Sequence, residues 1–448
     1  MPIYNINGEN LQSAYNVNGS PIVNSYDVNG IQIYPSGDVL TSFDIFYPDD
    51  ATSDYEYNYS TSCTLTSEQF LALEYDGFVS NPPSGITVTK KSLGKDAGLY
   101  DIYEYDFCPQ NPIRKILIVT GVHATELASQ FGISLLLKHI YRIDDNTAFA
   151  YIRNNVRIKV VPVFNPYGYN QSPRTYYGYL GINPERNFAY GDLWNIYDSS
   201  ASYNFKGDYP FQSDVSRIMA KWYIDNQDAD FCLNCHTGAN DNAYDIWTDY
   251  MANEYTVPCI NAAVSKNSEK FTEKFGRTPV VNNVITQYPN STGMGMHGMW
   301  NRNCAKVPGF WVEQAEKNTT FGNGKDNSAG SINNYASVAS TYMMEMLLNK
   351  YQYIYDSIHP NNRKPITAIS AENITFNQSD IYKMASLSMT PNDTTQFIFD
   401  WESSDTSICE VWSATNEAVI VKRGTGTATI TVTNRSNSNI STSFIVTT

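Results

Sequence analysis

Residues 115–126 read KILIVT-GVHATE, a short apolar run followed by a segment with possible metal ligands. The run Lys115–Thr120 is typical of a buried strand, and the stretch after it, Leu127–Ile140, has helical spacing. A second strand is expected at Val156–Phe164 (VRIKVVPVF) and a second, amphipathic helix at Asp214–Ile224 (DVSRIMAKWYI). Strands that alternate with helices predict an α/β fold, with a mostly parallel mixed sheet and helices on both faces.

Further segments extend this pattern. Two more buried strands are expected at Phe231–Cys235 and Gly309–Val312, and a closing helix at Tyr335–Tyr351. Thr66 with Gln69 resembles a capping box that opens a short helix. Sheets of this kind bind ligands beyond the carboxyl ends of their strands, so the chemistry is sought just after each apolar run.

Two of the five histidines stand directly after predicted strands. His123 follows the first run, Glu126 stands three residues on, and His236 follows the strand at 231–235. A catalytic zinc takes three protein ligands and keeps one position open, and two histidines with one glutamate form a known set. We therefore expect His123, Glu126 and His236 to bind one Zn²⁺ per chain.

Three charged residues favour this metal site over the alternative that both histidines only form hydrogen bonds at strand ends. Glu313 ends the apolar segment GFWVE, where a carboxylate is costly to bury unless it is paired or used. It is the expected general base, which takes a proton from the attacking water and passes it to the leaving nitrogen. The guanidinium of Arg186 suits a substrate carboxylate, and Arg174 is expected to face the oxygen that gains charge in the tetrahedral intermediate.

The ordered motifs around these residues are similar to the zinc carboxypeptidase A-like family, over roughly residues 60–355. The motifs are Gly121-Val122-His123-Ala124-Thr125-Glu126, Asn165-Pro166-Tyr167-Gly168-Tyr169, Glu185-Arg186-Asn187-Phe188, Asn234-Cys235-His236 and Val312-Glu313. The resemblance implies that the two histidines with Glu126 bind zinc and that Glu313 is the base.

The resemblance also implies a substrate-binding segment. Arg174 would polarise the scissile carbonyl, and Arg186 would grip a carboxylate, with Glu185 and Asn187 beside it in the same segment. Tyr288 is the candidate for the mobile tyrosine that the family carries upstream of its base. Where carboxypeptidases have Asn, this chain has Glu185, which would repel a free terminal carboxylate or favour a substrate that bears an amine. The interval between the two arginines is also short, so strict C-terminal exopeptidase activity is not implied.

The N-terminal region, residues 1–37, contains an 11-residue repeat. Its copies are Tyr4-Asn5-Ile6-Asn7-Gly8, Tyr15-Asn16-Val17-Asn18-Gly19 and Tyr26-Asp27-Val28-Asn29-Gly30. Asn-Gly favours a type I′ turn, so each copy predicts a strand, a tight turn and a strand. Isolated hairpins are marginal in water, so the repeat is expected to serve anchoring or oligomerisation. It resembles the starts of tail-associated phage proteins; a flexible N-terminus is the alternative.

The C-terminal region, residues 366–448, contains short strands alone, which predicts an all-β sandwich. It resembles the group 2 bacterial immunoglobulin-like domain through three motifs: Thr390-Pro391-Asn392, Trp401-Glu402-Ser403-Ser404-Asp405 and Gly424-Thr425-Gly426-Thr427-Ala428-Thr429-Ile430. That resemblance implies surface display or adhesion. The metallopeptidase domain is then expected at residues 38–358.

Composition bounds the class of protein. The 448 residues carry a net charge of −15, which argues against nucleic acid and anionic membranes as partners. No stretch is apolar for the ~18–20 residues of a membrane span. Seven cysteines do not form a small disulfide framework, and Cys232 and Cys235 are expected to be core residues of a strand. The N-terminus has no recognisable secretory signal, and a virion-associated protein, or one that is extracellular or on the cell surface, is expected.

Three functions remain open at this point. The first is a zinc metallopeptidase that cuts cell-wall (peptidoglycan) peptides, carried on a phage particle or cell surface by its terminal modules, with phage tail or surface glycan partners. The second is a zinc-dependent N-acyl amino acid deacylase, a related class with the same ligands. The third is a non-enzymatic virion or adhesion protein that uses the fold as a scaffold.

Overall fold

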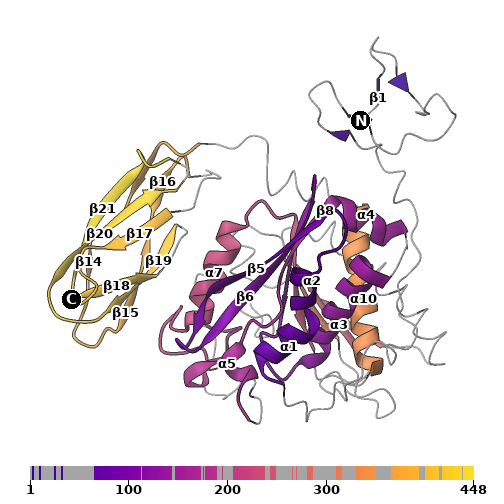
Figure 1. Ribbon diagram of the computed structural model, residues 1–448. Helices are drawn as coiled ribbons and strands as arrows, with labels where there is room; N and C mark the ends of the chain where they lie inside the picture. The colour runs from indigo at the N-terminus through magenta and orange to yellow at the C-terminus, as the bar shows by residue number, and fades with distance from the viewer. Residues whose placement is uncertain are drawn as a thin grey trace.

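Figure 1 shows the computed structural model of the chain. It describes residues 3–4, 10–11, 25–26, 32–33, 65–112, 114–143, 147–172, 175, 177–188, 194, 205–237, 243–248, 265, 269, 280–285, 309–314, 329–349, 365–392, 399–412, 416–435 and 437–448. An α/β unit lies at the centre, and a C-terminal β domain, drawn in gold, lies beside it.

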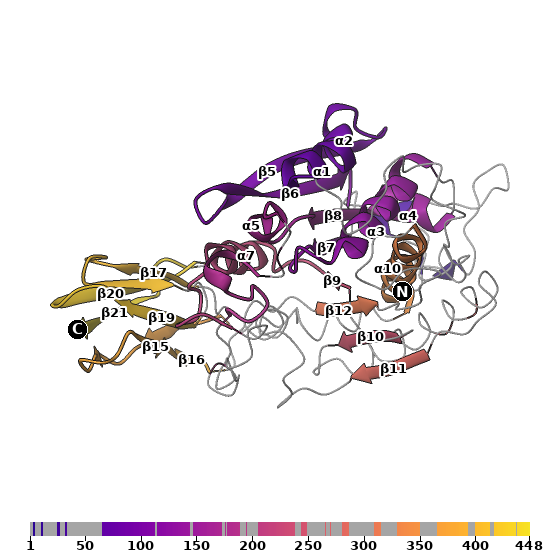
Figure 2. The ribbon, with the colours of Figure 1, turned by 90° about the horizontal axis from the view of Figure 1, so that it is seen from below.

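The α/β unit is built on one eight-stranded sheet in the order β11-β10-β12-β9-β7-β8-β6-β5, which Figure 2 shows from one edge to the other. The sheet is mixed: β11 with β10 and the run β12-β9-β7-β8 pair in parallel, and the other neighbours pair antiparallel. The strands are β5 (Ile86–Asp96), β6 (Tyr100–Pro109), β7 (Arg114–Thr120), β8 (Val156–Val161), β9 (Phe231–His236), β10 (Ala243–Thr248), β11 (Val280–Ile285) and β12 (Gly309–Gln314). The predicted mixed α/β sheet is therefore confirmed.

The central strand β7 shows why this sheet needs helices on both faces. Side chains alternate across a strand, so Ile116 and Ile118 enter one hydrophobic core while Leu117 and Val119 enter the other. All four side chains are fully buried. A strand that is apolar on both faces is stable only when each face is covered.

Helices cover the two faces unequally (Figure 1). One face carries α3 and α10, with α1, α2 and α4, and the other carries α7. A Cβ at Gly132 of α3 would lie 2.9 Å from the Cβ of Tyr335, so a glycine there lets α10 approach closely. The helices are α1 (Ser67–Glu74), α2 (Asp76–Ser80), α3 (Leu127–Lys138), α4 (Thr147–Asn155), α5 (Pro166–Tyr169), α7 (Asp214–Asp225) and α10 (Ala329–Asn349). The predicted capping box of Thr66 and Gln69 opens α1.

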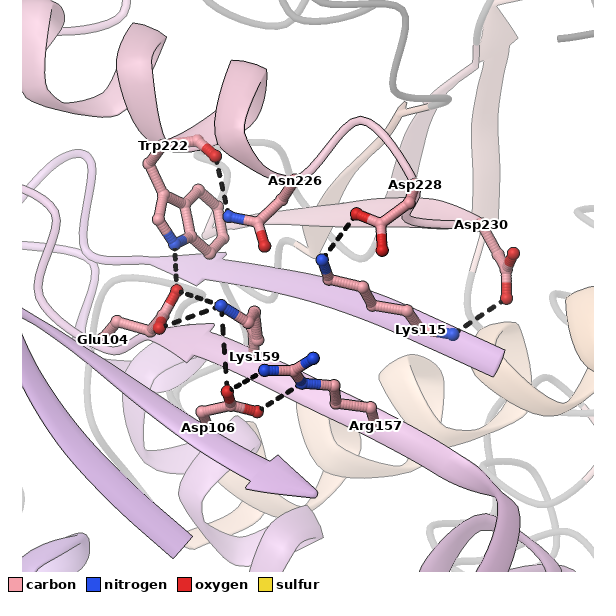
Figure 3. A network of polar contacts seen from close by, with 9 residues as sticks. All are labelled: Glu104, Asp106, Lys115, Arg157, Lys159, Trp222, Asn226, Asp228 and Asp230. Carbon is pink, nitrogen blue, oxygen red and sulfur yellow. Dashed lines mark hydrogen bonds and ion pairs between the residues drawn. The ribbon is translucent and has the colours of Figure 1, made fainter. Parts of the chain in front are cut away.

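Charged residues of β6 and β8 are paired under α7 (Figure 3). Lys159 Nζ lies 3.1 Å from both carboxylate oxygens of Glu104, and Arg157 binds Asp106 through two nitrogens at 2.9 and 2.6 Å. Trp222 of α7 donates its indole N–H to Glu104. Partly buried charges are tolerated when each one is paired and hydrogen-bonded, which explains the polar alternation of the VRIKVV segment.

The C-terminal β domain has its own hydrophobic core between three sheets, with the orders β14-β21-β20-β17, β15-β19-β18 and β13-β16. This agrees with the predicted β-rich unit. Its strands are β13 (Ala368–Ser370), β14 (Ile374–Thr375), β15 (Tyr382–Ser386), β16 (Ser388–Thr390), β17 (Phe399–Ser403), β18 (Cys409–Trp412), β19 (Glu417–Lys422), β20 (Thr427–Asn434) and β21 (Ser441–Thr447).

Strand β19 joins this domain to the α/β unit. Its four central residues are all buried: Ile420 enters the core of the β domain, whereas Val419 and Val421 enter the α7 core of the α/β unit. At the same junction the guanidinium of Arg217 lies 4.1 Å from the ring centroid of Trp412. The two units therefore share a packed interface.

At the N-terminus, β1 (Ile3–Tyr4) pairs with β2 (Asn10–Leu11), and β3 (Ser25–Tyr26) pairs with β4 (Gln32–Ile33). Residues 5–9 and 27–31 separate the paired ends. The Asn-Gly pairs of the first and third copies, where the tight turns are predicted, lie outside the described residues. The second copy lies outside the described residues. No helix among the described residues is long and apolar enough to cross a membrane.

Candidate metal centre

His123 and Glu126 lie on the short loop between β7 and α3. Gly121 opens that loop with φ +67°, and a Cβ there would lie 3.1 Å from the Gln130 amide and 3.3 Å from the Pro162 carbonyl oxygen. Glycine fits because it adopts positive φ without steric cost and leaves this space open. The Glu126 N–H donates to the His123 carbonyl at 3.0 Å, and Glu126 then begins α3 as its N-cap residue. The loop thus places both residues at the carboxyl end of strand β7.

His236 is the last residue of β9, which runs beside β7 in parallel. The carboxyl ends of the two strands therefore meet at the same edge of the sheet. Thr237 ties them together, because its N–H donates to Glu126 Oε2 at 3.1 Å and its Oγ1 accepts the N–H of Ser129 at 3.2 Å. The buried strand also contains Cys235, and burial raises the pKa of its thiol to about 12, as suits a core residue.

The structure brings the three predicted ligands together. Glu126 Oε1 lies 2.9 Å from His123 Nδ1, and Glu126 Oε2 lies 3.2 Å from His236 Nδ1. The exposed fractions are 2% for His123, 4% for Glu126 and 0% for His236. The Nδ1 atoms of both histidines therefore face one carboxylate inside the protein.

The electrostatics of this cluster favour a positive charge at its centre. Burial opposes the charged form of His236, but its hydrogen bonds with Glu126 and Glu185 outweigh burial and raise its pKa to about 10. Burial also opposes the ionised form of Glu126, yet His123 and His236 hold the pKa of that carboxyl at about 2. Burial lowers the pKa of His123. A carboxylate with two imidazoles thus binds a cation here, either a proton or a metal ion.

The donor set fits zinc. One ligand atom of each of the three residues lies within 4.8 Å of the others, as a single ion requires. Imidazole nitrogens with one carboxylate oxygen form a set that zinc uses in catalytic sites with one position left open.

The backbone of Glu313 lies beside this cluster. In the parallel pair of β12 and β9, Glu313 is the register partner of His236, and Asp245 of β10 is its partner on the other side. The predicted base thus stands on the strand next to a predicted ligand, at the same level of the sheet.

The substrate-binding segment predicted from the sequence lies close to the histidines. Glu185 Oε2 is 3.6 Å from His236 Nε2, and Arg186 next to it is 7% exposed. The side chain of Asn187 forms structural hydrogen bonds: its amide donates to the Lys206 and Tyr209 carbonyls at 2.7 and 3.0 Å. Its role in binding substrate stays a prediction.

Two predicted site residues, Arg174 and Tyr288, lie outside the described residues. Two others were missed by sequence reasoning: Asn183, whose Oδ1 lies 3.3 Å from His123 Nε2, and Thr237. Each lies close in the sequence to a predicted site residue: Asn183 stands two residues before Glu185, and Thr237 directly follows His236.

A comparison with protein families matches residues 109–278 to the model of the zinc carboxypeptidase family. This segment contains the three ligands, Arg186 and Glu185. Together with the His-Glu-His cluster, it identifies a zinc carboxypeptidase domain, and zinc is the cofactor of that family. A comparison with curated protein sequences gives no significant match.

Solved structures show the same fold. Carboxypeptidase A from Helicoverpa armigera superposes with a TM-score of 0.51 at 16% identity, over 66% of this chain and 77% of that chain. Thrombin activatable fibrinolysis inhibitor superposes with a TM-score of 0.51 at 15% identity, over 69% of this chain and 80% of that chain.

Proposed function

We propose that this hydrolase, whose residues 109–278 form a zinc carboxypeptidase domain, cleaves an amide bond next to a carboxylate group in cell-wall peptides. The observation that carries the proposal is the buried His123–Glu126–His236 cluster at the carboxyl ends of β7 and β9. Zinc, when bound by these residues, supplies a Lewis acid that polarises the scissile carbonyl and lets water attack at neutral pH.

The protein's own residues supply proton transfer, substrate binding and charge stabilisation. Glu313 takes the proton of the attacking water and passes it to the leaving nitrogen, a transfer that commonly contributes 10²–10⁴-fold in rate. Its register beside His236 supports this role. Arg186 holds the substrate carboxylate through a bidentate pair, which fixes the amide relative to the base. Arg174 meets the oxygen that gains negative charge, as the resemblance implies.

The regions that flank the catalytic domain support cell-wall peptides as the substrate class. Stem peptides of peptidoglycan carry several carboxylates close to amide bonds, which suits a guanidinium in the substrate-binding segment. We take the paired strands at the N-terminus and the C-terminal β domain to be modules that attach the enzyme to a particle, a cell or a glycan surface. We extend the proposal to a location on a phage particle or a cell surface.

Digestion of purified peptidoglycan by the zinc-loaded full chain, followed by mass spectrometry of the fragments, tests this function. The expected result is a defined peptide fragment with a new free amine, absent when the Glu313→Gln variant is used. Loss of one terminal residue would assign exopeptidase activity, and cleavage inside the peptide would assign endopeptidase activity. Cleavage of N-acyl amino acids alone would assign a deacylase, and no cleavage of either class by zinc-loaded protein would support the scaffold role.

A further inference from the structure

A four-residue turn, 183–186, lies against the metal centre. The N–H of Arg186 donates to the Asn183 carbonyl at 3.0 Å, and the N–H of Glu185 donates to Asn183 Oδ1 at 2.9 Å. The N–H of Asn183 itself donates to the Phe205 carbonyl at 2.7 Å, which fixes the turn to a distant segment. Asn183 and Glu185 are both fully buried. The turn is therefore buried and held in place by hydrogen bonds.

This turn meets both histidines on the nitrogen that faces away from Glu126. His123 Nε2 lies 3.3 Å from Asn183 Oδ1, and His236 Nε2 lies 3.6 Å from Glu185 Oε2. The Nδ1 atoms of the same two rings face the Glu126 carboxylate. Each imidazole is thus held between Glu126 on one side and one residue of the turn on the other.

The chemistry of these contacts fixes the proton on each ring. Asn183 Oδ1 accepts an N–H from Glu185, so it is an oxygen, and Nε2 of His123 can only donate to it. The Glu185 carboxylate oxygen Oε2, 3.6 Å from Nε2 of His236, favours a proton on that nitrogen in the same way. In the neutral form of each ring the lone pair is then on Nδ1. Metal-ligating histidines commonly donate their second N–H to a carboxylate or carbonyl, which orients the ring and raises its basicity.

We infer that Glu185 is a positioning residue that holds His236 in the tautomer and orientation needed for zinc, and is not a substrate-binding residue. The inference rests on the zinc site of the proposed function and not on its substrate. Glu185 is fully buried, and its carboxylate oxygen Oε2 faces His236 Nε2 at 3.6 Å, which places it against a predicted ligand of the metal. Arg186, the next residue, keeps some exposure and remains the candidate for substrate contact.

Competition with a chelator of known affinity measures zinc binding to the full chain. Loss of such an outer contact typically costs 10–100-fold in metal affinity, so Glu185→Gln should bind zinc about 10–100-fold more weakly than wild type. Glu185→Asp keeps the charge but shortens the reach, and should weaken zinc in the same direction. The matched control is Glu372→Gln, the same change at an exposed position, which should leave zinc affinity unchanged.

A measurement on the wild type keeps the inference testable if both Glu185 variants fail to fold. With ¹⁵N-labelled histidine, NMR of the zinc-loaded chain should show His236 protonated on Nε2 with slow exchange of that proton. A proton on Nδ1 would overturn the inference. So would folded Glu185 variants with wild-type zinc affinity but a changed KM for amine-bearing peptides. If the wild type itself binds no zinc, the proposed function fails instead, and the two failures are thus distinguishable.

Discussion

Glu313 of β12 and His236 of β9 are register partners on adjacent parallel strands. His236 is the last residue of its strand, so the pair stands at the carboxyl edge of the sheet, where ligands of α/β sheets bind. A carboxylate on the strand next to a ligand of the metal can act on water at that edge without being a ligand itself. This position suits the predicted role of Glu313 as a base, distinct from the predicted role of Glu126 as a ligand.

The first prediction follows for Glu313→Gln. The variant should fold and keep zinc, because the three ligands are untouched, but should lose about 10²–10⁴-fold in kcat, the usual share of proton transfer. Metal analysis and turnover of a soluble peptide check both parts. A variant with nearly wild-type turnover would make Glu313 a structural residue.

The second prediction concerns removal of the metal. Zinc binds the folded state, so at a free concentration of 1,000 times Kd it should add about 4 kcal/mol to the free energy of unfolding. Chelator should therefore lower the Tm of the wild type, which carries about one zinc per chain. His236→Ala should lack bound zinc and show no such change in Tm, whereas His139→Gln, outside the cluster, should behave as wild type. An unchanged Tm for metal-free wild type would contradict this.

Much of the centre of the fold follows from the sequence, because its signals are local. Strands β7 and β9 are short, largely apolar segments, and the two histidines stand at or just after their ends. Other features depend on contacts between distant segments. The antiparallel strands β5 and β6 read as polar, alternating segments, and their place at the sheet edge is set by the pairing of β6 with β8 and of β5 with β6.

The site shows the same division between local and distant signals. His123 and Glu126 are close in sequence and share one loop, so their cooperation could be predicted. The contact of Asn183 with His123 spans 60 residues and depends on the folded path of a turn, which no spacing rule indicates. The sequence could place Glu185 near the site but could not show that it is fully buried against His236.

The third prediction concerns Arg186. A hydrogen-bonded pair with a charged group contributes about 1.5–3 kcal/mol, so Arg186→Ala should lower kcat/KM roughly 10–100-fold for substrates that carry the carboxylate. For amidated versions of the same peptides the loss should be far smaller. Arg186→Lys keeps the charge without the fork and should give an intermediate loss. Equal losses on both substrate forms would move Arg186 out of the binding site.

The fourth prediction is a pH dependence from Asp96 at the end of β5. Burial raises its pKa from 3.8 to about 6, although the N–H of Tyr167 donates to Oδ2 at 3.3 Å and opposes the shift. Because the folded pKa is above the unfolded value, Asp96 favours folding below pH 4 and loses that contribution as pH rises to about 6. This difference between the folded and unfolded pKa of Asp96 corresponds to about 3 kcal/mol of folding free energy. Asp96→Asn should therefore raise the free energy of unfolding at pH 7 by up to this amount.

Denaturant unfolding at several pH values checks the sign of that effect. The gain from Asp96→Asn should shrink between pH 6 and pH 4, where Asp96 takes up its proton in the wild type. Asp208→Asn, at an exposed position, is the control and should change stability little at either pH. A gain that grows as pH falls would contradict the assignment of the buried carboxyl.

The fifth prediction tests whether the C-terminal β domain supports the catalytic domain. Val419 is fully buried in the core that contains α7, and Arg435 of the same domain pairs with Asp225 of that helix at 2.8 Å. Burying a valine side chain contributes about 1.5–3 kcal/mol, so Val419→Ser should destabilise the junction by roughly 2 kcal/mol. Calorimetry should then show the α/β unit unfolding at a lower temperature. Ile445→Ser is the matched control, because Ile445 belongs to the same domain but is 46% exposed.

If both variants unfold like the wild type, the β domain is a display module that the catalytic domain does not need. If Val419→Ser alone lowers the transition, the interface is part of what keeps α7 and the sheet beneath it in place.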